Sequence, residues 1–250
     1  LDSLEECGRT GVTECMFIEG HYKMWVRLIA CTLSYGGCGF VDSCASGGGR
    51  NDLESMRRGI PLLRSDSDRT TSALRLSMSH GFNRWIPFCG ANTKEKLEEL
   101  SPVGETSPYV WRASYLPVLN VESLWIHENP ENFPMTRFGL NEWKKVRPFL
   151  LKDFYVHTPW HSKNDTSGFC AFSYYDSETE KGVITAFRQE TCEENELKIT
   201  VEYADKQRSY TLCDEDSGNV TKYSGEELCE GISIFFDSPK SSHLFWISAE

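Results

Sequence analysis

The sequence contains no surplus of positive charge and no long hydrophobic run, and both absences narrow the classes of protein to which it can belong. Its 250 residues hold 26 Lys and Arg against 37 Asp and Glu, a formal net charge of −11. A surface of that sign repels phosphate backbones, so we expect no nucleic acid partner. No apolar stretch reaches the roughly 20 residues that a membrane-spanning helix needs, so we expect no membrane partner either.

Other absences concern metals, disulfides and targeting signals. The ten cysteines include no Cys-x-x-Cys pair, the spacing that many zinc sites use. A chain of this length does not need disulfides to fold, so we expect reduced thiols and a cytoplasmic location. His157 and His161 have a metal-like spacing, but Pro159 lies between them and we predict no metal site. The first residues carry neither an initiator Met nor a signal-peptide pattern, which fits a chain that begins inside a longer protein.

The first 150 residues alternate short apolar runs with helical patterns. The runs cover residues 40–41, 60–63, 85–88 and 117–121, and the helices are expected over 25–33, 53–58, 71–78 and 138–146. Strand-then-helix units are typical of a parallel sheet with crossover helices. Because a complete (β/α)₈ barrel takes about 250 residues, four units predict about half of one. An open doubly wound sheet is the structural alternative.

The pattern changes after about residue 155. Residues 197–203 alternate strictly between apolar and polar side chains, as in a half-buried strand. Similar runs at 169–175, 183–188, 209–213, 232–236 and 244–247 are separated by turn-rich pieces, and we interpret their aromatic side chains as core. Short strands at this spacing predict an antiparallel β-sandwich. The predicted domains are therefore the second half of an α/β (TIM) barrel at 1–152 and a β-sandwich at 153–250.

Two motifs carry candidate chemistry, each at the end of a predicted strand. In the first, residues 42–50, three consecutive glycines would let a ligand approach the main chain closely, although a purely structural turn is the alternative. The Gly-Lys-Ser/Thr of a phosphate loop is not present there. In the second, Asp66 follows a predicted strand and could serve as a general acid, or simply cap a helix. Asp68 is the rival for the same role.

Taken together, these segments resemble the family 36 glycoside hydrolases, the large microbial α-galactosidases. The resemblance is carried by Phe40–Leu53, Pro61–Asp66, Trp85–Phe88, Lys152–Pro159 and Gly182–Arg188, which occur in the family's order. It implies hydrolysis of terminal α-linked galactose in oligosaccharides by double displacement with retention, without a cofactor or metal. Asp66 falls at the position of the acid/base. The implied substrate-binding residues are Cys44, Gly47, Gly48, Arg50 and Arg64.

The resemblance also implies what this chain lacks. The nucleophile is expected to be an Asp that follows a Lys at the end of an earlier strand, and no Lys-x-Asp at a strand end occurs here. We therefore expect the isolated chain to be inactive, and the parent enzyme to be a possible homo-oligomer. Leu63 and Arg64 stand where the family often has Trp and Thr. These departures leave open α-N-acetylgalactosaminidase or galactosyl-transfer activity, and an inactive carbohydrate-binding fragment is the alternative from another class.

Overall fold

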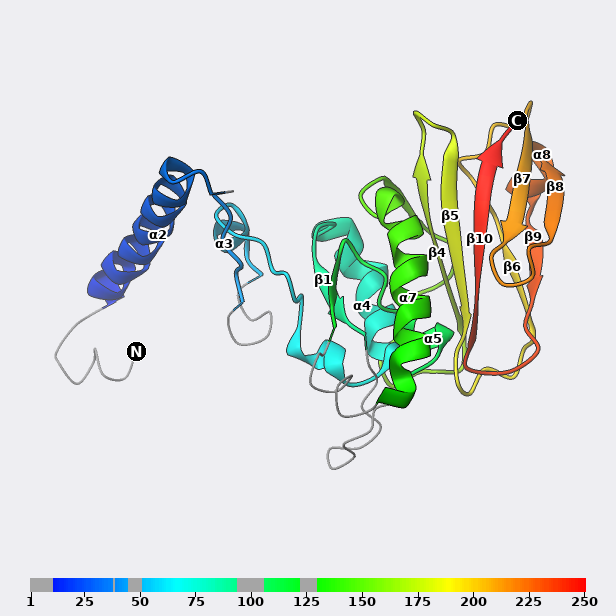
Figure 1. Ribbon diagram of the computed structural model, residues 1–250, viewed down its shortest axis with the longest axis horizontal. Helices are drawn as coiled ribbons and strands as arrows, with labels where there is room; N and C mark the ends of the chain where they lie inside the picture. The colour runs from blue at the N-terminus through cyan, green and yellow to red at the C-terminus, as the bar shows by residue number, and fades with distance from the viewer. Residues whose placement is uncertain (1–10, 38, 45–50, 94–105, 122–129) are drawn as a thin grey trace.

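The computed structural model describes residues 11–37, 39–44, 51–93, 106–121 and 130–250. Figure 1 shows a projecting N-terminal helix, a mixed helix-and-strand part in the middle and a layered β-structure at the C-terminal end. No helix in the described part of the chain is long and apolar enough to cross a membrane.

Antiparallel sheets form the C-terminal part, as the sequence predicts. A six-stranded sheet has the order β3-β4-β5-β10-β7-β8, and every neighbouring pair in it is antiparallel. Strands β6 and β9 form a separate antiparallel pair. The strands are β3 (Asp153–Val156), β4 (Phe169–Asp176), β5 (Lys181–Arg188), β6 (Glu196–Ile199), β7 (Ser209–Asp214), β8 (Val220–Ser224), β9 (Ile232–Phe235) and β10 (Ser241–Ala249).

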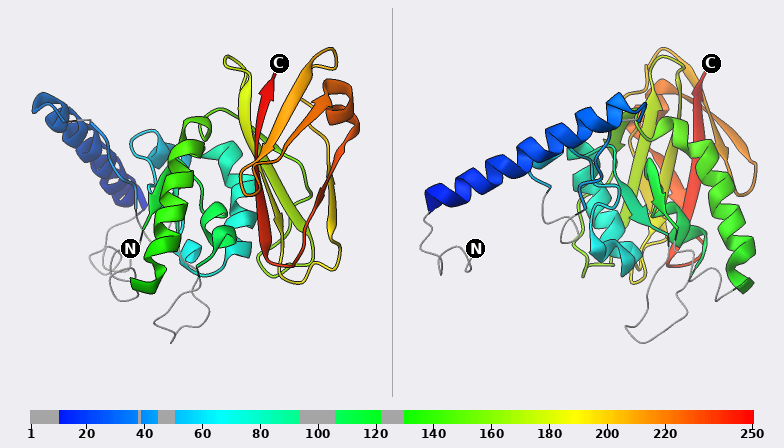
Figure 2. Two further views of the ribbon diagram at one scale, coloured as in Figure 1. Left: turned by 45° about the vertical axis from the view of Figure 1, so that its right-hand side comes forward. Right: turned by 60° about the vertical axis from the view of Figure 1, so that its left-hand side comes forward.

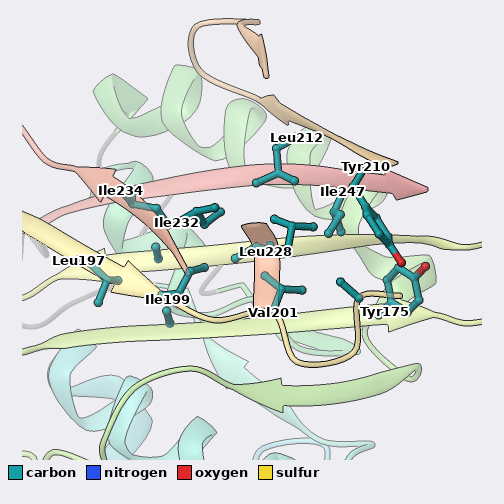
Figure 3. Close-up of a cluster of buried hydrophobic side chains, with 14 of the residues drawn as sticks. Tyr175, Leu197, Ile199, Val201, Tyr210, Leu212, Leu228, Ile232, Ile234 and Ile247 are labelled. Atoms are coloured by element: carbon teal, nitrogen blue, oxygen red, sulfur yellow. The ribbon is translucent and has the colours of Figure 1, made fainter. Parts of the chain in front are cut away.

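The six-stranded sheet is covered on both faces. On one face, Phe172 and Tyr174 of β4 pack against helices α4 (Ser72–Trp85), α5 (Pro108–Arg112) and α7 (Phe133–Val146). On the other face, Ala171 and Tyr175 join the apolar core beneath β6 and β9, which Figure 3 shows in close-up. This second core also takes in Leu228 of the short helix α8 (Gly225–Glu230). Because the sheet is covered on both faces, nearly every residue of β4 and β5 is buried. Along β6, which is covered on one face, buried and exposed residues alternate.

The N-terminal part contains parallel pairings, although its regular strands are short. Strand β1 (Gly90–Asn92) pairs in parallel with β2 (Val118–Asn120), and an isolated parallel bridge joins Asp42 to Ile60. The amide of Arg64 donates to the carbonyl of Gly90 at 3.1 Å, which links these two parallel pieces. Residues 41–43, 60–64, 90–92 and 118–120 are thus neighbours in chain order.

Three details differ from the sequence prediction. The alternating run at 197–203 forms a strand only over Glu196–Ile199, because the chain turns at residues 202–203. The run at 85–88 is not a strand, because helix α4 continues to Trp85 and the strand begins only at Gly90. A short apolar run does not distinguish helix from strand by periodicity alone. Phe235, interpreted as core, leaves 62% of its surface exposed.

The remaining helices are short, apart from the first. Helix α2 (Gly11–Ser34) lies apart from the sheets (Figures 1 and 2) and contacts the segment after α3 (Leu53–Met56), where the guanidinium of Arg58 lies 4.4 Å from the Tyr22 ring. Helix α3 and three single 3₁₀ turns at Asp66–Arg69, Pro130–Asn132 and Arg147–Phe149 complete the described elements.

Candidate functional site

The first predicted motif begins at a strand end that is tied to the next parallel run. The amide of Ser43 donates to the carbonyl of Ile60 at 3.0 Å, and the amide of Ile60 donates to Val41 at 3.0 Å. The carboxylate of Asp42 accepts a hydrogen bond from the amide of Leu62 at 3.1 Å. Cys44 follows with its side chain exposed and its thiol free. Gly47, Gly48 and Arg50 lie outside the described residues.

The motif is tied to the same run again at its far end. The side-chain amide of Asn51 donates to the carbonyl of Arg64 at 3.2 Å. Asp52 caps helix α3, because its carboxylate accepts hydrogen bonds from the amides of Glu54 and Ser55 at 2.9 and 3.0 Å. Ser43 and Asn51, on either side of residues 45–50, are therefore both tied to residues 60–64, the run that leads directly to Asp66.

Asp66 lies at the end of that run with its side chain exposed. It begins a 3₁₀ turn that Ser65 caps, since the Ser65 hydroxyl accepts a hydrogen bond from the amide of Ser67 at 3.2 Å. An exposed carboxylate on a capped turn is accessible to a ligand, as a general acid must be. Its catalytic role stays a prediction, and so does that of Asp68, whose side chain is not among those described.

Arg64 occupies a different environment from the other predicted site residues. Its side chain is fully buried, and the guanidinium donates to the Ser79 hydroxyl at 3.0 Å and to the Arg75 carbonyl at 2.9 Å. Both partners belong to helix α4. The side chain therefore fastens α4 to the run 60–64 that leads to Asp66. The sugar contact predicted for Arg64 stays a prediction, and the geometry favours a positioning role.

The structure adds polar residues that we did not single out from the sequence. Asn92 and Asn120 end strands β1 and β2, and Asn92 is buried. The side-chain amide of Asn120 donates to the carbonyl of Leu62 at 3.0 Å. Because parallel strands have their carboxyl ends at one edge, Asn92 and Asn120 lie at the same edge of their pair, and Asn120 reaches the run that leads to Asp66. The signal was the one used for Asp66, a polar residue after an apolar run.

The histidines considered for a metal have other roles. Both ring nitrogens of His157 are engaged, Nδ1 with the Thr200 carbonyl at 2.9 Å and Nε2 with the Ser173 hydroxyl at 2.8 Å. Burial lowers the pKa of His157, which favours the neutral ring. His161 pairs with Asp165 at 2.9 Å instead of converging with His157 on a common point.

The fold was compared with proteins of known sequence and structure. No family model matches the sequence, and no curated protein matches it either. Among solved structures, an α-galactosidase from Lactobacillus brevis superposes with a TM-score of 0.71 at 19% identity, over 92% of this chain and 31% of that one. A variant of the GH36 α-galactosidase AgaA from Geobacillus stearothermophilus in complex with raffinose gives a TM-score of 0.62 at 18% identity, over 83% and 28% of the two chains.

A third structure comes from Bacillus halodurans and carries a provisional name of α-N-acetylgalactosaminidase. It gives a TM-score of 0.54 at 12% identity, covering 92% of this chain and 62% of that one. The present chain thus spans under a third of the length of the α-galactosidases to which it is similar. At these identities the similarity concerns the fold. The chain has the fold of the matching third of the family 36 α-galactosidases.

Proposed function

We propose that this chain is the acid/base part of a retaining family 36 α-galactosidase, with Asp66 as the general acid and base. The observation that carries the proposal is the joining of the two predicted motifs at one edge. The glycine-rich segment is held at Ser43 and Asn51 against the run that presents Asp66. Both motifs belong to a chain with the fold of glycoside hydrolases.

We further propose that the four parallel runs belong to the second half of a (β/α)₈ barrel. Three observations support this assignment: the parallel pairing of β1 with β2, the parallel bridge between Asp42 and Ile60, and the order of the runs. In a barrel, residues at the carboxyl ends of the strands form the active site. The whole enzyme would then supply the remaining strands and the nucleophile from outside this chain.

The proposed chemistry assigns each residue one task. Asp66 gives its proton to the glycosidic oxygen as the bond to the anomeric carbon breaks, and the nucleophile from the rest of the enzyme forms the glycosyl–enzyme bond. Asp66 then takes a proton from water, which attacks the anomeric carbon and releases the nucleophile. Cys44, the backbone of Gly47 and Gly48, and Arg50 would bind the sugar, while Arg64 holds α4 in place.

The test is Asp66→Asn in the complete parent enzyme. Hydrolysis of raffinose should fall by about 10²–10⁴-fold, because its leaving group needs a proton. For an aryl α-galactoside with an acidic phenol as leaving group, the glycosylation step should be affected much less. Asp68→Asn is the matched control and should keep most of the activity. Equal losses of kcat/KM for the two substrates, or a larger loss of kcat/KM in Asp68→Asn, would move the acid/base role away from Asp66.

A second test uses the isolated chain. It should not hydrolyse aryl α-galactosides, since a retaining mechanism cannot start without its nucleophile. Turnover by the purified 250-residue chain that disappears in Asp66→Asn would show that it carries a complete site of its own.

N-acetylgalactosamine is the second candidate sugar. The similarity to the Bacillus halodurans structure favours it, and Leu63 and Arg64 depart from the pattern of the α-galactosidases. The ratio of kcat/KM for the 4-nitrophenyl α-glycosides of galactose and N-acetylgalactosamine, measured on the parent enzyme, decides between the two.

A further inference from the structure

A concave site lies between the two sheets of the C-terminal part. It is a groove of about 250 Å³ that opens where β9 covers the inner face of β7, β8 and β10. Aromatic and polar side chains share its lining: Tyr223, Phe245, Asp214, Asn219, Thr221 and Phe235. The groove lies on the face of the six-stranded sheet opposite helices α4 and α7.

The aromatic wall of the groove is only partly covered by protein. Tyr223 and Phe245 pack against the edge of the inner core, the apolar core between the six-stranded sheet and strands β6 and β9. Both rings keep part of their surface accessible. Phe245 is fixed in orientation because it stacks on His243, with ring centroids 5.7 Å apart. Rings that are held in place and still accessible offer a flat apolar surface to a ligand at little cost in side-chain entropy.

The polar wall presents hydrogen-bonding groups of three kinds. The carboxylate of Asp214 is held by its own turn, since Oδ1 accepts hydrogen bonds from the amides of Asp216 and Ser217 at 2.8 and 3.2 Å. Its Oδ2 lies 3.6 Å from Nδ1 of His243. The amide of Asn219 and the hydroxyl of Thr221 are exposed at the rim. A carboxylate, an amide and a hydroxyl together can both donate to and accept from a ring of hydroxyl groups.

Charge and size restrict the class of ligand. The carboxylate of Asp214 and the acidic balance of residues 151–250, 9 Lys and Arg against 19 Asp and Glu, disfavour phosphates and other anions. A metal is disfavoured as well, because both oxygens of Asp216 bind Arg112. The volume is slightly below the roughly 300–1,000 Å³ of pockets for drug-sized ligands, which suits one sugar ring.

We propose that this groove is a non-catalytic binding site for one residue of a neutral oligosaccharide. The apolar face of the pyranose ring lies on Tyr223 and Phe245, and its hydroxyls bind Asp214, Asn219 and Thr221. The site goes beyond the proposed hydrolase activity, because it needs neither Asp66 nor the glycine-rich segment. It gives the chain a second, independent contact with a carbohydrate substrate.

The experiment measures binding of three neutral probes, raffinose, maltotriose and cellotriose, to the complete 250-residue chain. Isothermal titration and saturation-transfer NMR should detect saturable binding of at least one of them. Tyr223→Ala should weaken that binding at least tenfold, whereas the matched Tyr223→Phe should keep it within about threefold, since the ring face remains.

Tyr223 also packs against the inner core, so a second variant keeps the test decisive. Thr221→Trp places a large side chain at the exposed rim, where it should block the groove without disturbing the core. Loss of binding in a Thr221→Trp chain with an unchanged Tm supports the proposal. The proposal is overturned if the unmodified chain binds none of the three probes saturably. It is equally overturned if binding persists in both Thr221→Trp and Tyr223→Ala.

Discussion

The N-terminal and C-terminal parts of the chain differ in how their apolar surface is covered. Every strand of the six-stranded sheet lies within a hydrogen-bonded ladder, and its apolar side chains are covered by helices on one face and by β6 and β9 on the other. Helix α2, in contrast, leaves many large apolar side chains exposed. These are Met16, Phe17, Ile18, Met24, Val26, Leu28 and Leu33.

The contacts between the parallel runs of the N-terminal part also differ in kind from those within the antiparallel sheets. Residues 40–66 are joined mainly by single backbone hydrogen bonds and by polar side chains such as Asp42 and Asn51. Each hydrogen bond of this type contributes only about 0.5–1.5 kcal/mol net, whereas burial of one large apolar side chain contributes about 1.5–3 kcal/mol. The difference indicates that the stability of the isolated chain resides in the sheets and in the three helices that pack on them.

The largest expected effect is at Arg112, which joins these helices to the sheet. Its guanidinium binds Glu142 of α7 at 2.8 and 2.9 Å and Asp216 of the β7–β8 turn at 2.6 and 2.8 Å. Burial opposes the charge, but the hydrogen bonds to Glu142 and Asp216 outweigh it and raise the pKa of Arg112. Arg112→Ala should lower the free energy of unfolding by about 3–5 kcal/mol, because Glu142 remains buried without its partner.

Urea denaturation measures this loss, and Arg208→Ala is the matched control. Arg208 forms an ion pair with Glu180 at the surface, where both side chains are partly exposed. Its removal should change stability far less than removal of Arg112. Equal effects of the two substitutions would show that the buried pair does not hold the helices to the sheet.

The second largest effect is expected from substitutions at two helical glycines, Gly139 and Gly81. A Cβ atom on Gly139 of α7 would lie 2.0 Å from the buried ring of Trp111, while one on Gly81 of α4 would meet nothing within 4 Å. Gly139→Ala should therefore cost about 1–3 kcal/mol through overpacking. Gly81→Ala should stabilise the chain by about 0.5–1 kcal/mol, because Ala favours the helix. Thermal unfolding of the two variants should give shifts of opposite sign, and shifts of the same sign would contradict the close packing of α5 on α7.

These residues also show how much of the structure a sequence can reveal. The antiparallel strands after residue 169 were predictable, since each is a local run of apolar or alternating side chains. Helix α8 was predictable as well but was overlooked, although Ser224 and Glu227 form a capping box. The ionic contacts of Arg112 were not predictable. Its partners Glu142 and Asp216 lie 30 and 104 positions away, and no local pattern relates residues so far apart.

The candidate site also combines features that the local sequence predicts with features that depend on tertiary contacts. Asp66 and Cys44 follow apolar runs, so their place shortly after the paired residues Ile60 and Asp42 could be predicted from the local pattern. The hydrogen bond from Asn51 to the carbonyl of Arg64 could not, because no local pattern relates residues 13 positions apart. The burial of the Arg64 side chain depends in turn on where helix α4 packs.

A smaller effect should appear with pH, through His157. Burial lowers the pKa of this ring in the folded chain, so below its usual value of about 6.5 the unfolded chain binds more protons. The free energy of unfolding should therefore fall as the pH drops below about 6.5 and level off below the pKa of the folded state. His157→Gln should remove this part of the pH dependence in urea titrations between pH 7.5 and 4.5. An unchanged profile in that variant would assign the dependence to other groups.

The smallest expected effect is on helix α2. Leu28 leaves 51% of its surface exposed, and Gln has a helix propensity close to that of Leu. Leu28→Gln should therefore change the free energy of unfolding of the isolated chain by no more than about 0.5 kcal/mol. The same substitution at Leu76, which is 1% exposed in helix α4, should cost several times more, because it places an amide in the apolar layer beneath the sheet. A large loss in Leu28→Gln would mean that α2 is packed in solution, and the contrast between the two parts of the chain would then be smaller than their exposed surfaces indicate.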